Sequence, residues 1–210
     1  MSRPVLFVLA GVNGAGKSSI GGHLLEQRHL SWFNPDTFSR ELMAIAGCDH
    51  ATANAHAWNE GVRRLDEAIA GGHDHAFETT LGGHTIAARI AEATRTHDVV
   101  IWFCGLASPE QHIARVRLRV AAGGHDIPEV RIRERYPQAL RNLIALMPAL
   151  AHLHVYDNST DVAPGDPIPE PVLVLEMVDG RMVWPDADDV PALQRTPDWA
   201  KPLLEAALGA

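Results

Sequence analysis

"GVNGAGKS", Gly11–Ser18, is the stretch that decides the fold. It matches the pattern G-x-x-x-x-G-K-[ST] in full, follows an apolar run and precedes a segment with helical character. The glycines let backbone N–H groups close around phosphate, and a helix N-terminus adds positive potential. Lys17 would reach the β- and γ-phosphates of a nucleotide, and the Ser18 hydroxyl would ligate Mg²⁺. An ordinary glycine-rich turn is the alternative, and the strand–loop–helix context disfavours it.

The phosphate-loop motif also predicts which residues bind the nucleotide. They are Gly11, Asn13, Gly14, Ala15, Gly16, Lys17, Ser18 and Ser19. The sequence has no N-K-x-D guanine signature, so ATP is preferred over GTP as the cofactor.

Strands and helices are predicted to alternate on both sides of this loop. Val5–Ala10 is a continuous apolar run of the kind found in strands buried on both faces. Further strands are expected in "LSWFNPD" (30–36), "HAFETTL" (75–81), "DVVIWFCGL" (98–106) and "HLHVYDNS" (152–159). Helices are expected at Lys17–Gln27, Thr52–Ala70 and Thr85–Thr94, from Ser108 onward, and after a break at Gly123–Gly124. This alternation predicts an α/β fold with a five-stranded parallel sheet covered by helices on both faces.

Domain organisation follows from a proline-rich stretch near the end of the chain. Residues 1–162 are predicted to form the phosphate-loop domain, and 163–171 ("APGDPIPEP") a linker. Residues 172–210 are expected to form a β-hairpin that turns on Asp179–Gly180, followed by a helix.

Charge and composition indicate which binding partners and which cellular compartment to expect for this protein. The chain of 210 residues carries a formal net charge of −8, which disfavours general nucleic-acid binding. The apolar run near the N-terminus is too short to span a membrane and lacks a signal peptide's cleavage region. With only two cysteines, the chain is expected to be cytoplasmic, without a disulfide framework and without a membrane partner.

Carboxylates end two of the predicted strands. Asp36 follows the second strand, and ligands of open α/β sheets bind beyond the carboxyl ends of the strands. It could take a proton from an acceptor hydroxyl, or it could instead be the N-cap of the next helix. Glu78 and Thr80 end the third strand on the same edge and could hold the acceptor or a Mg²⁺-bound water. The alternative is a polar strand end without a ligand.

Arginines gather around the glycine break. Seven of the sixteen arginines fall between Arg115 and Arg141. Arg119 with Arg133 or Arg135 is predicted to form a lid that offsets charge on a transferring phosphoryl group. Arg117 and Arg141 are instead interpreted as residues of a solvated helix face, where their side chains pair with glutamates.

Together these motifs resemble the zeta toxin family of P-loop kinases. The resemblance spans roughly 4–159 and rests on "GVNGAGKSS", "FNPDTF", "FETTL", "RVAAGGHDIPE", "RERYPQALRNL" and "YDNS". It looks closest to the stand-alone chromosomal members of the family. It implies phosphoryl transfer from ATP, with Mg²⁺, to a hydroxyl of a small molecule. In the toxins the acceptor is the sugar of UDP-N-acetylglucosamine. An antitoxin protein is a partner that the resemblance allows.

The resemblance also assigns roles to individual residues. Lys17 and Ser18 match the nucleotide and Mg²⁺ positions, and Asp36 matches the catalytic aspartate. Glu78 and Thr80 match the acceptor side, and Asn158 matches a position near the adenine. Arg119 matches the first lid arginine, and Arg133 or Arg135 the second. This chain departs from the family at Glu134, where an arginine is usual, and it lacks the long acceptor-binding insert of the larger toxins.

Two other functions remain open from the sequence. A nucleotide or polynucleotide kinase shares the arginine lid, although no basic surface is evident beyond it. An ATP-binding switch or interaction module without phosphoryl transfer would not need an acceptor-side base such as Asp36.

Overall fold

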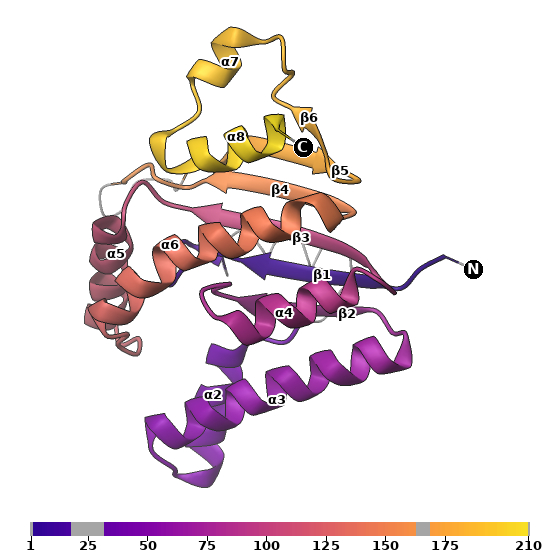
Figure 1. The fold of residues 1–210 in the computed structure, drawn as a ribbon. Coiled ribbons are helices and arrows are strands. Elements are labelled where there is room, and N and C mark those ends of the chain that lie inside the picture. Colours follow the sequence, from indigo (N-terminus) through magenta and orange to yellow (C-terminus); the bar gives the residue numbers. More distant parts are fainter. Residues whose placement is uncertain (1, 18–31, 163–168, 210) are drawn as a thin grey trace.

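The described part of the chain contains a six-stranded sheet in the order β2-β1-β3-β4-β5-β6 (Figure 1). The computed structural model describes residues 2–17, 32–162 and 169–209. The strands are β1 (Val5–Ala10), β2 (His75–Thr79), β3 (Asp98–Gly105), β4 (His152–Asp157), β5 (Val172–Val178) and β6 (Arg181–Trp184). The strands β2, β1, β3 and β4 pair in parallel, and β5 and β6 continue the sheet in antiparallel pairs.

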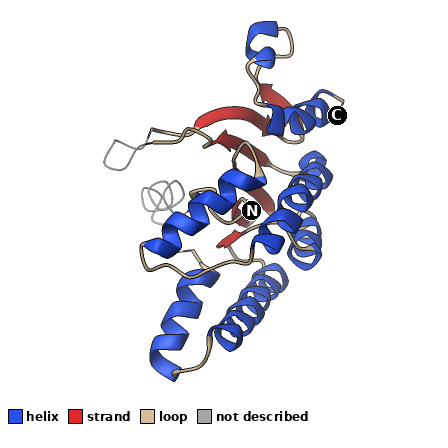
Figure 2. Cartoon of the chain, turned by 90° about the vertical axis from the view of Figure 1, so that its left-hand side faces the viewer, coloured by secondary structure: helices blue, strands red, loops and turns tan. Residues whose placement is uncertain are grey.

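Helices cover the sheet and extend beyond one edge. They are α2 (Pro35–Ala46), α3 (His50–Gly71), α4 (His84–Ala93), α5 (Pro109–Ala121), α6 (Glu129–Leu146), α7 (Val190–Gln194) and α8 (Lys201–Leu208). Two short 3₁₀ helices, Met147–Ala149 and Asp198–Ala200, precede β4 and α8. In Figure 1, α4, α6 and α8 cross the near face of the sheet. The pair α2–α3 projects past β2, as Figure 2 also shows.

The core explains the apolar runs in the sequence. Leu6, Val8, Ile101 and Phe103 are almost completely buried in the main cluster beneath the helices. The opposite face of the sheet has a smaller cluster of Phe7, Leu9, Ala76 and Trp102. Since β1 and β3 are buried on both faces, their sequences lack the polar alternation of a half-exposed strand.

Local signals set several helix boundaries. The Ser108 side chain accepts a hydrogen bond from the Gln111 amide, and Pro109 occupies the first turn of α5, as predicted. The helix α3 ends at Gly72 in a left-handed conformation, which a glycine adopts without strain. The break between α5 and α6 falls at Gly123–Gly124, and the loop runs from 122 to 128.

Three predictions concern the fold class, the number of parallel strands and the helix after the phosphate loop. The α/β P-loop architecture is confirmed, and among the described residues its parallel part has four strands, where the sequence predicts five. In "LSWFNPD", the described residues contribute only an isolated bridge from Phe33 to Phe77, because the chain turns into α2 directly afterwards. The helix predicted at Lys17–Gln27 lies almost wholly outside the described residues.

The C-terminal segment adds to the same sheet. Its hairpin turns on Asp179 (φ 49°) and Gly180 (φ 72°), as predicted. Trp199, Leu203 and Leu204 from the last turns belong to the main core cluster. The division into 1–162, a linker at 163–171 and 172–210 stays a prediction, although β5 and β6 make the sheet continuous across it. No helix in the described ranges is long and apolar enough to cross a membrane.

Candidate active site

The phosphate loop follows β1 and is built around positive-φ glycines. Gly11, Gly14 and Gly16 have φ angles of 143°, 86° and 86°. A Cβ at Gly11 would lie 2.3 Å from the Cys104 carbonyl oxygen, so neither its conformation nor its packing allows a side chain. At Gly16 a Cβ would meet the Asn158 Nδ2 at 2.5 Å. This backbone suits the binding of phosphate by N–H groups, as the motif predicts.

The Lys17 ammonium group contacts a carbonyl oxygen and a carboxylate beside the phosphate loop. Its Nζ donates to the Gly11 carbonyl at 2.7 Å and lies 3.4 Å from the Glu78 Oε1. Lys17 and Glu78 are 7% and 8% exposed, so this is a buried pair of opposite charges. The Asn34 Nδ2 donates to the other Glu78 oxygen at 2.8 Å. Buried charges need this kind of pairing, and it fixes both side chains close to the loop.

Asn158 braces the loop from β4. Its Nδ2 donates to the Ala15 carbonyl at 2.9 Å, and its backbone N–H donates to the Gly105 carbonyl. The predicted contact of Asn158 with the nucleotide stays a prediction. Ser18 and Ser19, the predicted Mg²⁺ and nucleotide positions after Lys17, lie outside the described residues.

Asp36 stands in the first turn of α2, but it does not cap that helix. The Asn34 side chain does so, accepting hydrogen bonds from the Asp36 and Thr37 amides at 2.9 and 3.1 Å. The interpretation of Asp36 as the N-cap is therefore wrong, because the helix begins at Pro35, two residues earlier than an Asp36 cap would require. With capping assigned to Asn34, the half-exposed Asp36 carboxylate remains available for chemistry.

A cavity of about 260 Å³ brings the predicted acceptor-side residues together. Its polar lining includes Asn13, Lys17, Asn34, Asp36, Asn54, Glu78, Thr79, Thr80, His125 and Arg135. An apolar wall comes mainly from Phe33, Trp58 and Phe77. Trp58 is 51% exposed, so α3 offers a flat aromatic surface to whatever occupies this space. Residues from the phosphate loop, β2, α2, α3, α4, α6 and the 122–128 loop converge here, beyond the carboxyl ends of β1 and β2.

Only part of the arginine cluster faces this cavity. The Arg135 Nη1 donates to the Asn13 Oδ1 at 2.8 Å, and burial lowers the pKa of the guanidinium below its usual value. Arg133 is exposed and pairs with Glu110 at the start of α5. Of the two candidates for the second lid arginine, Arg135 alone lines the cavity among the described residues.

Arg119 is not among the described residues that line the cavity. Its Nη2 donates to the His125 carbonyl at 3.2 Å, and its Nε has no hydrogen-bond partner among the described residues. A Cβ at Gly124 would lie 2.7 Å from the Arg119 Cγ, so the glycine turn wraps closely around this side chain. In this geometry Arg119 supports the loop that carries His125.

Two histidines that are not among the predicted site residues lie near the site, and the sequence leaves His125 open as a phosphate contact or a helix cap. The His125 Nε2 lies 3.8 Å from the Asp36 Oδ2, and its ring lies 5.1 Å from that of His50. Burial lowers the pKa of His125, while Asp36 opposes the shift. His112 is 1% exposed and its Nδ1 contacts the Asn13 carbonyl at 2.9 Å. Because a carbonyl only accepts, Nδ1 carries the proton, and burial lowers the pKa of His112 to about 4.

No local motif could have found these contacts. His112 looks like an ordinary helix residue in the sequence, and its partner is 99 positions away. His125 does stand in the Gly-Gly-His turn, which was a signal, but its approach to Asp36 depends on how the loop packs against α2.

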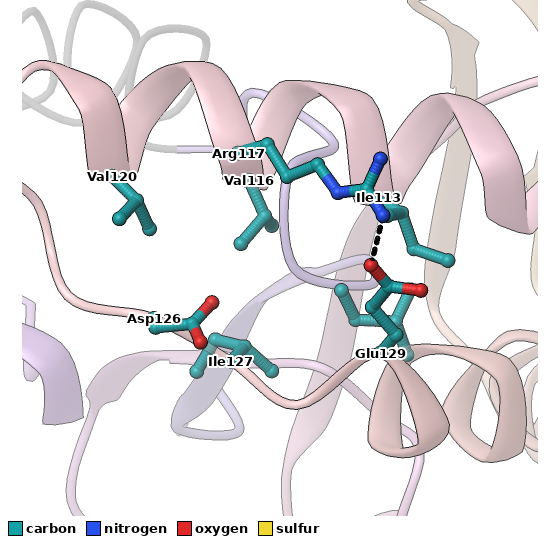
Figure 3. A pocket seen from close by; sticks show the side chains of 8 residues that line it. Ile113, Val116, Arg117, Val120, Asp126, Ile127 and Glu129 are labelled. Atoms are coloured by element: carbon teal, nitrogen blue, oxygen red, sulfur yellow. Dashed lines mark hydrogen bonds and ion pairs between the residues drawn. The ribbon is translucent and has the colours of Figure 1, made fainter.

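A second cavity, of about 300 Å³, lies between α5 and the loop that leads to α6. In Figure 3, Val116 and Val120 point from α5 toward the loop that carries Asp126 and Ile127, and the Arg117–Glu129 ion pair lies at one side. Ile127 lines both this cavity and the acceptor cavity, so the two spaces adjoin at this residue.

Comparison with known proteins relates this geometry to solved structures. No protein-family model matches the chain, and the search of curated proteins found no match. A chain from the AvrRxo1-ORF1:-ORF2 complex with ATP superposes with a TM-score of 0.61 at 18% identity. That match covers 94% of this chain and 64% of the other, so the chain spans less than two thirds of that protein.

Two further structures align with TM-scores of 0.52. One is from the PezAT chromosomal toxin-antitoxin system of Streptococcus pneumoniae, at 14% identity, covering 75% of this chain and 68% of that one. The other is described as a kinase of Chloroflexus aurantiacus, at 17% identity, with coverages of 64% and 76%. The chain has a P-loop kinase fold. At these identities the likeness establishes the fold alone, and the chemistry has to be argued from this chain's own residues.

Proposed function

We propose that this protein is an ATP-dependent phosphotransferase of the zeta-toxin type, which transfers the γ-phosphoryl group to a hydroxyl of a small molecule. The observation that carries this proposal is the shared cavity of Lys17, Asp36, Thr80 and Arg135 beside the phosphate loop. A phosphotransferase needs a phosphate grip, an acceptor-side base and a compensating positive charge in one space.

The proposed reaction assigns one role to each of these groups. The acceptor hydroxyl oxygen bonds to the γ-phosphorus of ATP, the bond from that phosphorus to the bridging oxygen breaks, and ADP leaves. Asp36 takes the hydroxyl proton. Lys17 and Arg135 offset the negative charge that is redistributed over the transferring group and the leaving oxygen. Mg²⁺, with Ser18 as its predicted ligand, would neutralise charge on the β- and γ-phosphates.

Glu78 and Thr80 belong to the acceptor side of the proposed site. Glu78 is fixed by Lys17 and Asn34, so its position is set before any ligand binds. The Thr80 Oγ1 accepts from the Gly82 amide at 3.4 Å, and the hydroxyl proton can therefore be directed to an acceptor oxygen. These contacts support the expectation that both residues orient the acceptor.

The acceptor that we propose is a hydroxyl-bearing metabolite such as a nucleotide sugar, with UDP-N-acetylglucosamine as the named candidate from the family resemblance. The exposed face of Trp58 in the cavity supports an acceptor with a flat sugar or ring face. An antitoxin-like protein partner is part of the proposal because the PezAT and AvrRxo1-ORF1:-ORF2 structures come from a toxin-antitoxin system and a two-protein complex.

The test is to incubate the protein with γ-labelled ATP, Mg²⁺ and a metabolite extract, and to identify phosphorylated products by mass spectrometry. Separate reactions offer UDP-N-acetylglucosamine, free nucleosides and a 5′-hydroxyl oligonucleotide. Label on a small hydroxyl metabolite supports the proposal, whereas label on nucleosides or the oligonucleotide supports a nucleotide or polynucleotide kinase. ATP binding without any labelled product supports a switch.

Lys17→Met is the control for this experiment, and we expect it to abolish transfer. Because Lys17 is buried against Glu78, each preparation also needs a thermal melt to show that it is folded. A folded Lys17→Met protein with normal turnover would refute the phosphate-loop assignment.

A further inference from the structure

We propose that Asn13 and Gly82 are positioning residues for Arg135. Asn13 fixes the guanidinium head through a hydrogen bond, and Gly82 leaves the space in which the stem of the side chain lies. This inference rests on the proposed phosphotransferase function and concerns how that site is assembled. It gives the phosphate loop a second task beside holding the nucleotide.

Asn13 connects two helices through one residue. Its Oδ1 accepts from the Arg135 Nη1 at 2.8 Å, and its backbone carbonyl accepts from the His112 Nδ1 at 2.9 Å. Since arginine has no acceptor, only the oxygen of the Asn13 amide can face it. Asn13 is 7% exposed and His112 is 1% exposed, so water does not compete freely for either contact. The loop is therefore tied to α5 by its main chain and to α6 by a side chain.

Gly82 explains how the Arg135 stem reaches that position. A Cβ at Gly82 would lie 2.6 Å from the Arg135 Cγ, 2.7 Å from its Cβ and 3.0 Å from its Cα. Gly82 is not among the residues with positive φ, so its backbone does not itself require glycine. Glycine is required at this position because any Cβ would overlap the Arg135 side chain. The adjacent Gly83 has nothing within 4 Å of a built Cβ and provides a matched control.

The two restraints leave most of the guanidinium for chemistry. Asn13 uses one of the N–H donors of Arg135, and the rest of the rigid fork remains for phosphoryl or acceptor oxygens. A group that is already in place needs no reorganisation as charge shifts in the transition state, so its fixation affects kcat more than ATP binding. Replacing Asn13 or Gly82 with alanine should therefore lower kcat as Arg135→Ala does, but by a smaller factor.

The experiment is a set of steady-state measurements on Asn13→Ala, Gly82→Ala and Gly83→Ala, each in the wild-type and the Arg135→Ala background. We expect Asn13→Ala and Gly82→Ala to lower kcat by about tenfold or more, as for loss of a hydrogen bond to a charged group. Their KM for ATP should change less than kcat does. Neither substitution should lower kcat further once Arg135 is alanine, and Gly83→Ala should leave kcat unchanged.

Asn13→Asp separates the hydrogen bond from other effects of the position. It keeps the acceptor oxygen, so kcat should be retained better than in Asn13→Ala. Its negative charge beside the phosphates should raise the KM for ATP. Equal losses of kcat in both backgrounds, equal effects of Gly82→Ala and Gly83→Ala, or an Arg135→Ala variant with normal kcat would each overturn the inference.

A second readout does not depend on turnover. Thermal stability of Asn13→Ala, Arg135→Ala and the double variant reports the contact itself, because coupled residues lose stability less than additively. Additive losses would overturn the inference even in a protein without transferase activity. Absence of phosphotransfer with non-additive losses would instead count against the proposed function alone.

Discussion

The segment formed by α5, the 122–128 loop and α6 has two faces that use arginine differently. On the outer face, Arg117, Arg131 and Arg133 are exposed and pair with Glu129, Glu134 and Glu110. On the inner face, Arg135 is half-buried beside Asn13, and Arg119 is half-buried behind His125. Exposed pairs of this kind contribute little to stability, while buried guanidinium groups are costly unless they have a partner or a function.

The contrast shows why charge clustering alone was ambiguous. Arg131 and Arg135 are four residues apart, a spacing that places two side chains on one helix face, yet Arg131 pairs with Glu134 and Arg135 reaches the cavity. Two long side chains can start on the same face of a helix and still end in different places. Their ion-pair and hydrogen-bond partners, rather than their spacing in the sequence, therefore decide where each guanidinium lies.

Arg135→Ala should lower kcat by about 10³-fold, the range for arginines that complete phosphoryl-transfer sites. Arg133→Ala should leave kcat within about twofold, since its exposed pair with Glu110 is remote from the cavity lining. Steady-state kinetics with the identified acceptor measures both. Equal effects at the two positions would show that the inner and outer faces do not differ. Arg119→Ala should fall between them, because Arg119 acts through the His125 loop.

His112 on the inner face of α5 should make stability depend on pH. Its folded pKa is about 4, below the ordinary 6.5, so between these values the unfolded chain binds a proton that the folded protein excludes. The free energy of unfolding should therefore fall as pH is lowered through this window, by about 3 kcal/mol in total. Urea denaturation at several pH values measures this slope.

His112→Asn is the matched control, because it places a non-titrating N–H donor near the position of Nδ1. The slope between pH 6.5 and pH 4 should be shallower in this variant than in the wild type. An unchanged slope would mean that other groups cause the acid sensitivity and that His112 is not held neutral by burial.

Asp36→Asn should lower phosphoryl transfer by roughly 10²-fold while ATP affinity is kept, as for loss of a general base. Since Asn34 is the cap of α2, this substitution should leave the melting temperature nearly unchanged. Kinetics, ATP titration and a thermal melt together decide the role. Loss of ATP affinity along with activity would instead point to a metal-linked role for Asp36.

Arg117→Ala should have the smallest effect, within roughly 0.5 kcal/mol of unfolding free energy and without change in kcat. Its ion pair with Glu129 lies on the rim of the second cavity and away from the acceptor cavity (Figure 3). Denaturation and kinetics on the same preparation measure both quantities. A large loss of kcat here would mean that the second cavity is coupled to catalysis.

Much of the fold was predictable because its signals are local. The run Val5–Ala10, the glycine loop, Ser108–Pro109 and Asp179–Gly180 each satisfy a backbone or burial requirement within a few residues. The strand prediction at 30–36 falls partly outside the described residues, and within them Phe33 forms a single bridge to Phe77 before the chain enters α2. The cap at Asn34 was missed in favour of Asp36, since both residue types cap well and lie two positions apart.

The sequence by itself determined the phosphate loop, the strands β1 to β4 and the gathering of arginines around Gly123–Gly124, since each is encoded by neighbouring residues. Only the tertiary structure decided that Arg135 rather than Arg133 lines the cavity, and that Asn13 joins His112 and Arg135 across separations of 99 and 122 residues. It also decided that Gly82 is needed for space, because a steric contact with α6 leaves no mark in the local pattern. Contacts between distant segments depend on packing, and packing is fixed by the whole chain.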